Sequence, residues 1–423
     1  MACIEERISY EFDTSYGGTP AIIPVGSGGT NYLISYSGNL NYGTLKHVVV
    51  VDDGSISTID TLVHVSSVTS YHNIVALPTL DQGTTGLFFL ITYINSDGHI
   101  QYKTILIDAD DNTISELDSL ESTFHPSYDC AFPHTAQISS DSSKFMTLYS
   151  VIESSTYLTL WLGRVVIGHT LSRLITNSLT QELVNTASNL CQYGKLTKID
   201  DTHLLATYAT QEDSAVIRAR SYSHDSSLTV TNIDEENIST WSWPHDIIKV
   251  TSYYYLLAVR DTVLTFGVNS STWAITSGIS SLDYTTEIPE TVSITQLSTY
   301  KFMIAYNDTT TNDGWVRVLN ASTSYVMTDY ASLEHEATFC NDSVVLGISS
   351  NSAILVYTGA SYDGFAKTFG PCTSKISIDG EWRNIIGMQI CITTSKVKSW
   401  ETVEGSKISI SSSWEDVLLA EDF

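Results

Sequence analysis

Positive charge is scarce in this chain. Only 20 of its 423 residues are Lys or Arg, against 47 Asp or Glu, so the formal net charge is −27 at pH 7. A field of this sign repels phosphate backbones and anionic lipid surfaces. We therefore expect no nucleic-acid partner, and we interpret most of the excess acid as a source of solubility.

Long apolar runs are missing too. The chain has no stretch of about 18 apolar residues, the length that a membrane-spanning helix needs. Its first residues lack the basic and apolar segments of a secretory signal. We expect no membrane insertion and no signal peptide, and therefore synthesis in the cytoplasm.

Cysteine pairs and the common catalytic motifs are also absent. The six cysteines are scattered without a C-x-x-C pair, and a chain of this length needs no disulfide framework. The sequence contains no G-x-G-x-x-G, P-loop, G-x-S-x-G or H-E-x-x-H motif. We expect no cofactor and no catalytic residue, and so a protein that is not an enzyme.

What the chain does contain is a repeated phrase in which apolar residues precede a Tyr in a strand-like setting. The copies are Tyr32–Tyr36, Phe89–Tyr93, Phe145–Tyr149, Leu204–Tyr208 and Phe302–Tyr306, with weaker ones at Tyr255–Val259 and Val344–Ile348. A period of about fifty residues with strand-like units is typical of a β-propeller. We predict an all-β fold.

The repeat also predicts the domain organisation. Residues 17–372 are expected to form a seven-bladed β-propeller in which each blade has four antiparallel strands. Residues 1–16 alternate weakly and can supply an edge strand. Residues 373–423 are expected to form a small C-terminal domain of β-hairpin repeats.

The C-terminal segment has a repeat of its own. Residues 375–385 and 407–417 are near-copies with an I-x-I strand, a tight turn and a W-x-x-[IV] strand, and residues 390–403 form a copy with a longer turn. Such hairpins offer a Trp that packs on a neighbour. The residues predicted to dock this module on a partner are Trp382, Trp400, Trp414, Ile376, Ile378, Ile408 and Ile410.

Two stretches resemble known repeats. Residues 294–308, followed by 314–319, resemble a propeller repeat of phage and bacterial surface proteins. Residues 376–385 resemble the I-x-I-x-G-x-W-[KR]-x-V hairpin repeat at the ends of tailed-phage structural proteins, although the last copy has Ser412 in place of the Gly.

The resemblance implies a component of a tailed-virus particle, in the tail, a fibre or the capsid decoration. It would be an oligomer that contacts other virion proteins and presents its propeller to a glycan or protein receptor on the host surface.

A carbohydrate-binding propeller is the alternative, with a glycan-degrading enzyme as a further one. Aromatic side chains stack on sugar faces, and the candidates are Tyr253, Tyr254, Trp241, Trp243 and Trp315, although packing between blades also uses such residues. Two carboxylates at a suitable separation would serve a glycosidase. Some pair among 47 acidic residues meets that condition by chance, so the count does not identify a site.

Two groups of residues are candidate metal ligands. His134 and His245 each follow a Pro and precede the end of a repeat phrase by 15 and 14 residues, which predicts matching positions near the propeller axis. Asp108 and Asp110 resemble the start of a calcium loop. The sixth position there is Thr113 instead of Gly, which favours an ordinary acidic turn.

Overall fold

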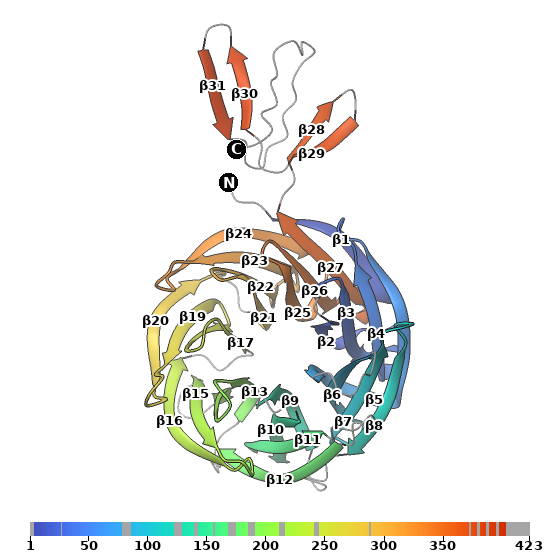
Figure 1. The fold of residues 1–423 in the computed structure, drawn as a ribbon, viewed down its shortest axis with the longest axis vertical. Helices are drawn as coiled ribbons and strands as arrows, with labels where there is room; N and C mark the ends of the chain where they lie inside the picture. The colour runs from blue at the N-terminus through green and yellow to red at the C-terminus, as the bar shows by residue number, and fades with distance from the viewer. Residues whose placement is uncertain are drawn as a thin grey trace.

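The sheets of the computed structural model radiate from one axis, as in a β-propeller (Figure 1). The structure describes residues 4–26, 28–77, 86–121, 129–138, 143–154, 157–167, 175–184, 191–210, 216–240, 245–286 and 289–371, and the backbone of strands between 374 and 402. Its described helical segments are single 3-10 turns, and none is long or apolar enough to cross a membrane. The prediction of an all-β propeller is confirmed.

The prediction of seven separate blades is wrong. In the described residues, five separate four-stranded sheets and one seven-stranded sheet surround the axis. The larger sheet arises because β5 (Ile56–Leu77) is continuous over 22 residues. Residues 56–68 of β5 pair with β4, and residues 69–77 pair with β6. One strand is thus the outer strand of one four-stranded unit and the innermost strand of the next.

Strands occupy four positions between the axis and the rim. The innermost strands are β2 (Gly18–Pro24), the second half of β5, β9 (Asp129–Gln137), β13 (Cys191–Lys198), β17 (His245–Lys249), β21 (Pro289–Ser298) and β25 (Asn341–Ser349). The second strands are β3 (Asn31–Ser37), β6 (Gly86–Asn95), β10 (Lys144–Ser154), β14 (His203–Thr210), β18 (Tyr254–Val259), β22 (Lys301–Asp308) and β26 (Ser352–Thr358).

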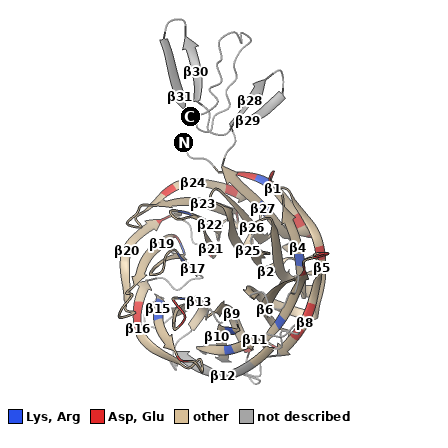
Figure 2. Cartoon of the chain, in the orientation of Figure 1, with Lys and Arg blue, Asp and Glu red and all other residues tan. Residues whose placement is uncertain are grey.

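The third strands are β4 (Tyr42–Val50), β7 (Ile100–Asp108), β11 (Tyr157–Ile167), β15 (Val216–His224), β19 (Thr262–Val268), β23 (Gly314–Ala321) and β27 (Gly364–Pro371). The outer strands are the first half of β5, β8 (Ile114–Glu121), β12 (Ile175–Val184), β16 (Val230–Ser239), β20 (Ile275–Asp283), β24 (Met327–Glu336) and β1 (Ile4–Asp13). Acidic residues are spread around the rim and do not gather in one sector (Figure 2).

The repeated phrase forms the second strand of each unit, where both faces are covered by neighbouring sheets. Its closing Tyr is almost fully buried, as at Tyr149 and Tyr208. The seventh copy was misplaced in the sequence. Residues 344–348 lie in innermost strand β25, and the equivalent second-strand copy is Ala353–Tyr357 in β26.

The two ends of the propeller meet in one sheet. Strand β1 pairs with β27 in antiparallel register, from Ile4 opposite Pro371 to Asp13 opposite Gly364. The sheet has the order β1-β27-β26-β25, so its outer strand comes from the start of the chain and the other three come from residues 341–371. Hydrogen bonds thus close the ring without any residue after 371.

The C-terminal segment contains two antiparallel pairs. β28 (Ser374–Ile378) pairs with β29 (Glu381–Ile385), and β30 (Gln389–Thr394) pairs with β31 (Val397–Thr402). The third expected hairpin, with Ile408, Ile410 and Trp414, lies outside the described residues.

A buried histidine recurs between neighbouring units. The ring of His335 meets Tyr357 edge-on at 5.1 Å, and its carbonyl accepts a hydrogen bond from Lys367. His64, Tyr93 and Lys103 repeat this arrangement elsewhere in the ring. Burial, followed by the charge of Lys367, lowers the pKa of His335 to about 3, so the folded protein holds this ring neutral.

We predict that His335→Gln reduces the acid sensitivity of the fold. Because the pKa falls from about 6.5 when unfolded to about 3 when folded, the stability linked to His335 is complete above the unfolded pKa and is lost as the pH falls toward 3. One proton corresponds to about 1.4 kcal/mol per pH unit. Urea unfolding near neutral pH and two units lower should show a difference smaller by about 2–3 kcal/mol in the variant.

The control is Phe369→Leu, which changes an apolar neighbour of the same histidine. It should lower the free energy of unfolding equally at the two pH values. An unchanged pH dependence in His335→Gln would contradict the assignment of a neutral buried histidine.

Candidate functional site

The main cavity lies on the propeller axis. It has a volume of about 620 Å³ and is lined by the innermost strands β2, β5, β9, β13, β17, β21 and β25. The lining residues come from the start of these strands and from the β5 segment beginning at Tyr71. Every sheet of the ring therefore contributes to one site.

A β-bulge at the start of most innermost strands shapes the wall. Two residues are left without a partner in the second strand in β2, β5, β9, β13, β21 and β25. In five of these strands the first bulged residue has a left-handed backbone, with φ between 46° and 55°: Thr19, Tyr71, Phe132, Tyr193 and Asp342. This conformation is costly for residues other than Gly, and such strain gathers at functional sites. The bulges aim these five side chains at the cavity.

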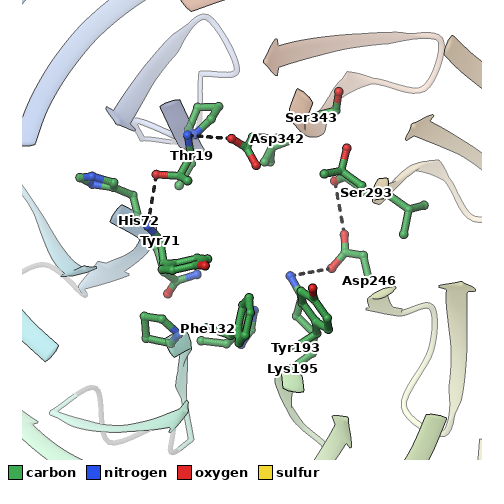
Figure 3. A pocket seen from close by; sticks show the side chains of 18 of the residues that line it. Thr19, Tyr71, His72, Phe132, Tyr193, Lys195, Asp246, Ser293, Asp342 and Ser343 are labelled. Carbon is green, nitrogen blue, oxygen red and sulfur yellow. Dashed lines mark hydrogen bonds and ion pairs between the residues drawn. The ribbon is translucent and has the colours of Figure 1, made fainter. Parts of the chain in front are cut away.

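Three aromatic side chains form an arc along one side of the cavity. The rings of Tyr71 and Phe132 lie 5.0 Å apart between centroids, and those of Phe132 and Tyr193 lie 4.3 Å apart. They come from three successive innermost strands, β5, β9 and β13. Figure 3 shows them side by side, with Asp246 and Asp342 across the cavity.

Carboxylates line the other side. Asp246 lies on β17, Glu290 on β21 and Asp342 on β25. Burial raises the pKa of Asp342 against the hydrogen bonds from Thr19 and Thr358, and the nearby Glu290 raises it further. The pKa of Tyr193 is raised by burial and then by Glu290, so this carboxylate acts on both sides of the cavity.

Side chains tie successive innermost strands together around the axis. An innermost strand has one neighbour in its own sheet, so some of its N–H groups point away from that sheet and need other acceptors. The hydrogen bonds run from Tyr71 N to Thr19 Oγ1 (3.2 Å), Thr135 N to Asn73 Oδ1 (3.1 Å), Leu196 N to His134 Nδ1 (3.2 Å), Ile294 N to Asp246 Oδ2 (3.0 Å), Val345 N to Ser293 Oγ (3.2 Å) and Thr19 N to Asp342 Oδ2 (3.2 Å).

One ion pair completes this ring of contacts. Lys195 Nζ lies 3.5 Å from Asp246 Oδ1, joining β13 to β17. The same carboxylate accepts from Ile294 N and, at 3.3 Å, from the Ser293 hydroxyl. Asp246 therefore links three innermost strands.

The two candidate histidines both line the cavity but are not equivalent. His134 lies opposite Leu148, the residue before the closing Tyr149, whereas His245 lies opposite the closing Val259. The residue that matches His134 is Asp246, opposite Ala258. The prediction of matching positions is therefore wrong by one residue, because β17 is paired from His245 onward without the bulge of β9.

The histidines of the cavity are accounted for by the fold. Burial, followed by the charges of Lys195 and His245, lowers the pKa of His134 to about 3, and its Nδ1 accepts from Leu196 N. His245 Nε2 lies 3.0 Å from Thr207 Oγ1, a hydrogen bond. Within the described residues no cluster of three His, Cys, Asp or Glu is suited to a metal ion.

The predicted calcium residues form a hairpin turn. Asp108 ends β7, and its Oδ1 accepts from Asp110 N at 2.8 Å, while its peptide N–H donates to the carbonyl of Thr113. Asn312 and Asn112 have the same left-handed backbone in matching turns. These contacts explain Asp108 and Asp110 as turn residues.

The aromatic residues singled out in the sequence lie elsewhere. Tyr253 and Tyr254 sit in the turn between β17 and β18, at the end of the propeller opposite the bulges, and each is 39% exposed. Tyr254 stacks on Tyr325 at 4.6 Å. Trp315 packs against a buried cluster on β23. Trp241, Trp243 and Trp414 lie outside the described residues, as do the side-chain positions of Trp382, Trp400, Ile376 and Ile378.

We predict that Asp246→Ala lowers the free energy of unfolding by about 1–3 kcal/mol, because Ile294 N loses a buried acceptor. Asp246→Asn keeps an oxygen acceptor and should cost less. Asp110→Ala, in the exposed turn, should fall within about 0.5 kcal/mol of the parent in urea unfolding. Equal losses for Asp246→Ala and Asp110→Ala would show that the ring contact adds no stability.

Comparison with known proteins adds the fold alone. No family model matches the sequence, and no curated protein matches it. Similar solved structures include a mutant α-L-arabinofuranosidase from Fusarium graminearum in complex with an iminosugar inhibitor, with 9% identity and a TM-score of 0.48 over 87% of this chain and 98% of that one. The S. cerevisiae core factor has 8% identity and a TM-score of 0.47, over 90% of this chain and 62% of that one.

A protein of unknown function from Dyadobacter fermentans is similar at 8% identity, with a TM-score of 0.46 over 87% of this chain and 99% of that one. Identities and TM-scores this low carry no information about what the chain binds.

Proposed function

We propose that this protein is a non-enzymatic binding propeller that holds a sugar ring in its axial cavity. The observation that carries the proposal is the arc of Tyr71, Phe132 and Tyr193 opposite the carboxylates of Asp246, Glu290 and Asp342. Ligand pockets combine apolar and aromatic walls with a few fixed polar groups.

The two sides of the cavity suit the two faces of a sugar. Its C–H groups carry slight positive charge and stack on the negative face of an aromatic ring. Its hydroxyl groups donate to carboxylate oxygens, which are strong acceptors when ionised. The cavity volume of about 620 Å³ lies within the range of small-ligand sites.

We predict that Phe132→Ala weakens glycan binding about tenfold, the loss expected for one aromatic contact of about 1.4 kcal/mol. A glycan array identifies the ligand, and calorimetry then compares the variants. The matched control is Tyr254→Ala, which removes an exposed aromatic ring at the opposite end of the propeller. Binding that falls with Tyr254→Ala and not with Phe132→Ala would move the site to that other end.

We further propose that the protein is carried on a tailed-virus particle, where residues 373–423 dock it to another virion protein or to a second copy. The resemblance of residues 376–385 to tailed-phage hairpin repeats supports this role. So does the closure of the propeller by β1 and β27, which leaves the C-terminal segment unnecessary for the ring. Many copies on one particle would multiply weak sugar contacts.

We predict that a chain ending at residue 372 keeps its folded propeller and its sugar binding but is lost from the particle. Thermal unfolding and glycan binding test the first part, and mass spectrometry of purified particles tests the second. A truncated chain that is still incorporated normally would refute the docking role.

One observation favours cleavage of the sugar as a second candidate function. The raised pKa of Asp342 next to Glu290 is the arrangement in which one carboxyl acts as an acid and another as a base. Release of reducing ends from the bound glycan, abolished by Asp342→Asn, would replace binding with hydrolysis.

A further inference from the structure

The axial cavity has an unbalanced charge. Three carboxylates line it, those of Asp246, Glu290 and Asp342, against one ammonium group, that of Lys195. Lys195 is paired with Asp246 at 3.5 Å. Among the described lining residues, this leaves the carboxylates of Glu290 and Asp342 without a cationic partner in the cavity.

The histidines that line the cavity supply little compensation. His72 is buried, with its Nδ1 2.8 Å from Ser35 Oγ, and burial lowers its pKa to about 3. His134 has its Nδ1 occupied by Leu196 N and is held neutral in the same way. Near neutral pH, therefore, these two rings do not offset the charge of the carboxylates.

The aromatic arc also favours a cation. A positive group within about 6 Å of an aromatic face is attracted by the ring quadrupole, and the attraction grows when water is excluded. Glu290 raises the pKa of Tyr193 and Asp342 raises that of Tyr71, each after the effect of burial. Each of these two aromatic rings thus has a carboxylate close enough to act on it.

We propose that the ligand is an amino sugar with a free, protonated amine, bound with its ammonium group between the Glu290 and Asp342 carboxylates and its ring against the aromatic arc. This inference rests on the proposed sugar-binding function and specifies its ligand. An N-acetylated sugar lacks the charge, and a carboxylated sugar carries the wrong sign, so both are disfavoured. The selectivity comes from a desolvated charge contact, which costs more to leave unpaired than a hydroxyl group does.

Three tetrasaccharides with the same β-1,4 backbone test the proposal: the tetramers of glucosamine, glucose and N-acetylglucosamine. Calorimetry with the full-length protein, in a buffer mild enough to keep the amine protonated, compares their dissociation constants. We expect the glucosamine tetramer to bind at least about tenfold more tightly than the other two. Glu290→Gln should remove most of this preference while leaving the weaker binding of the glucose tetramer nearly unchanged.

The whole chain is strongly acidic, so a general attraction for cations needs a control. Glu334→Gln removes the same charge from an exposed position on outer strand β24 and should leave the preference intact. Equal loss of preference in Glu334→Gln and Glu290→Gln would overturn the proposal in favour of a general field effect. Equal binding of the glucosamine and glucose tetramers would overturn it too, and would leave the sugar-binding function standing.

Failure of the proposed function gives a different result. None of the three tetramers would bind, and a glycan array would show no ligand for the parent protein. Asp342→Asn provides a second variant in the site, and circular dichroism at matched temperature shows whether either cavity variant is folded. A preference for the amine that survives both cavity substitutions would place the ammonium group elsewhere and refute the assignment.

Discussion

The hydrogen bonds between successive innermost strands are the contacts on which the cavity depends. Each innermost strand turns one edge toward the axis, where its N–H groups have no strand partner. A side chain of the neighbouring unit accepts one of them, as Asn73 does for Thr135 N and Asp246 does for Ile294 N. Because each contact sets the height of one strand against the next, it also sets where the bulged residues meet. The aromatic and acidic sides of the cavity follow from this alignment.

The same principle operates at the rim and explains part of the acidity. The first residue of an outer strand donates its N–H to an Asp of the preceding unit: Ile114 N to Asp60, Ile175 N to Asp118 and Ile275 N to Asp234, each at 2.7 Å. Solubility alone is therefore an incomplete reading of the net charge. Some carboxylates join one unit to the next, and others line the cavity.

The sequence was sufficient for the class of fold and insufficient for the site. The repeated phrase is conspicuous because the second strand is buried on both faces, so an unbroken apolar run marks it. The junction at β5 was not predictable, because continuity across two units leaves no compositional break between residues 56 and 77.

The cavity residues were missed for a related reason. Phe132 and Tyr193 precede their closing Tyr by 17 and 15 residues, and Tyr71 precedes its own by 22, because the intervening turns differ in length. No fixed spacing marks the bulge. The usable signal was local: an aromatic residue followed by Pro133 or Gly194, within an otherwise polar first strand. Exposed-looking aromatic pairs such as Tyr253 and Tyr254 drew attention instead, and they lie at the other end of the propeller.

The pairing of β1 with β27 has a consequence for how the chain is made. During synthesis β1 emerges first and its partner last, with more than 350 residues between them. Until then the nascent chain presents unpaired backbone edges that invite pairing with other chains. Contacts this distant in sequence also make the last folding step slow. We expect the newly made protein to depend on chaperones until ring closure, and the finished ring to resist unfolding from either end.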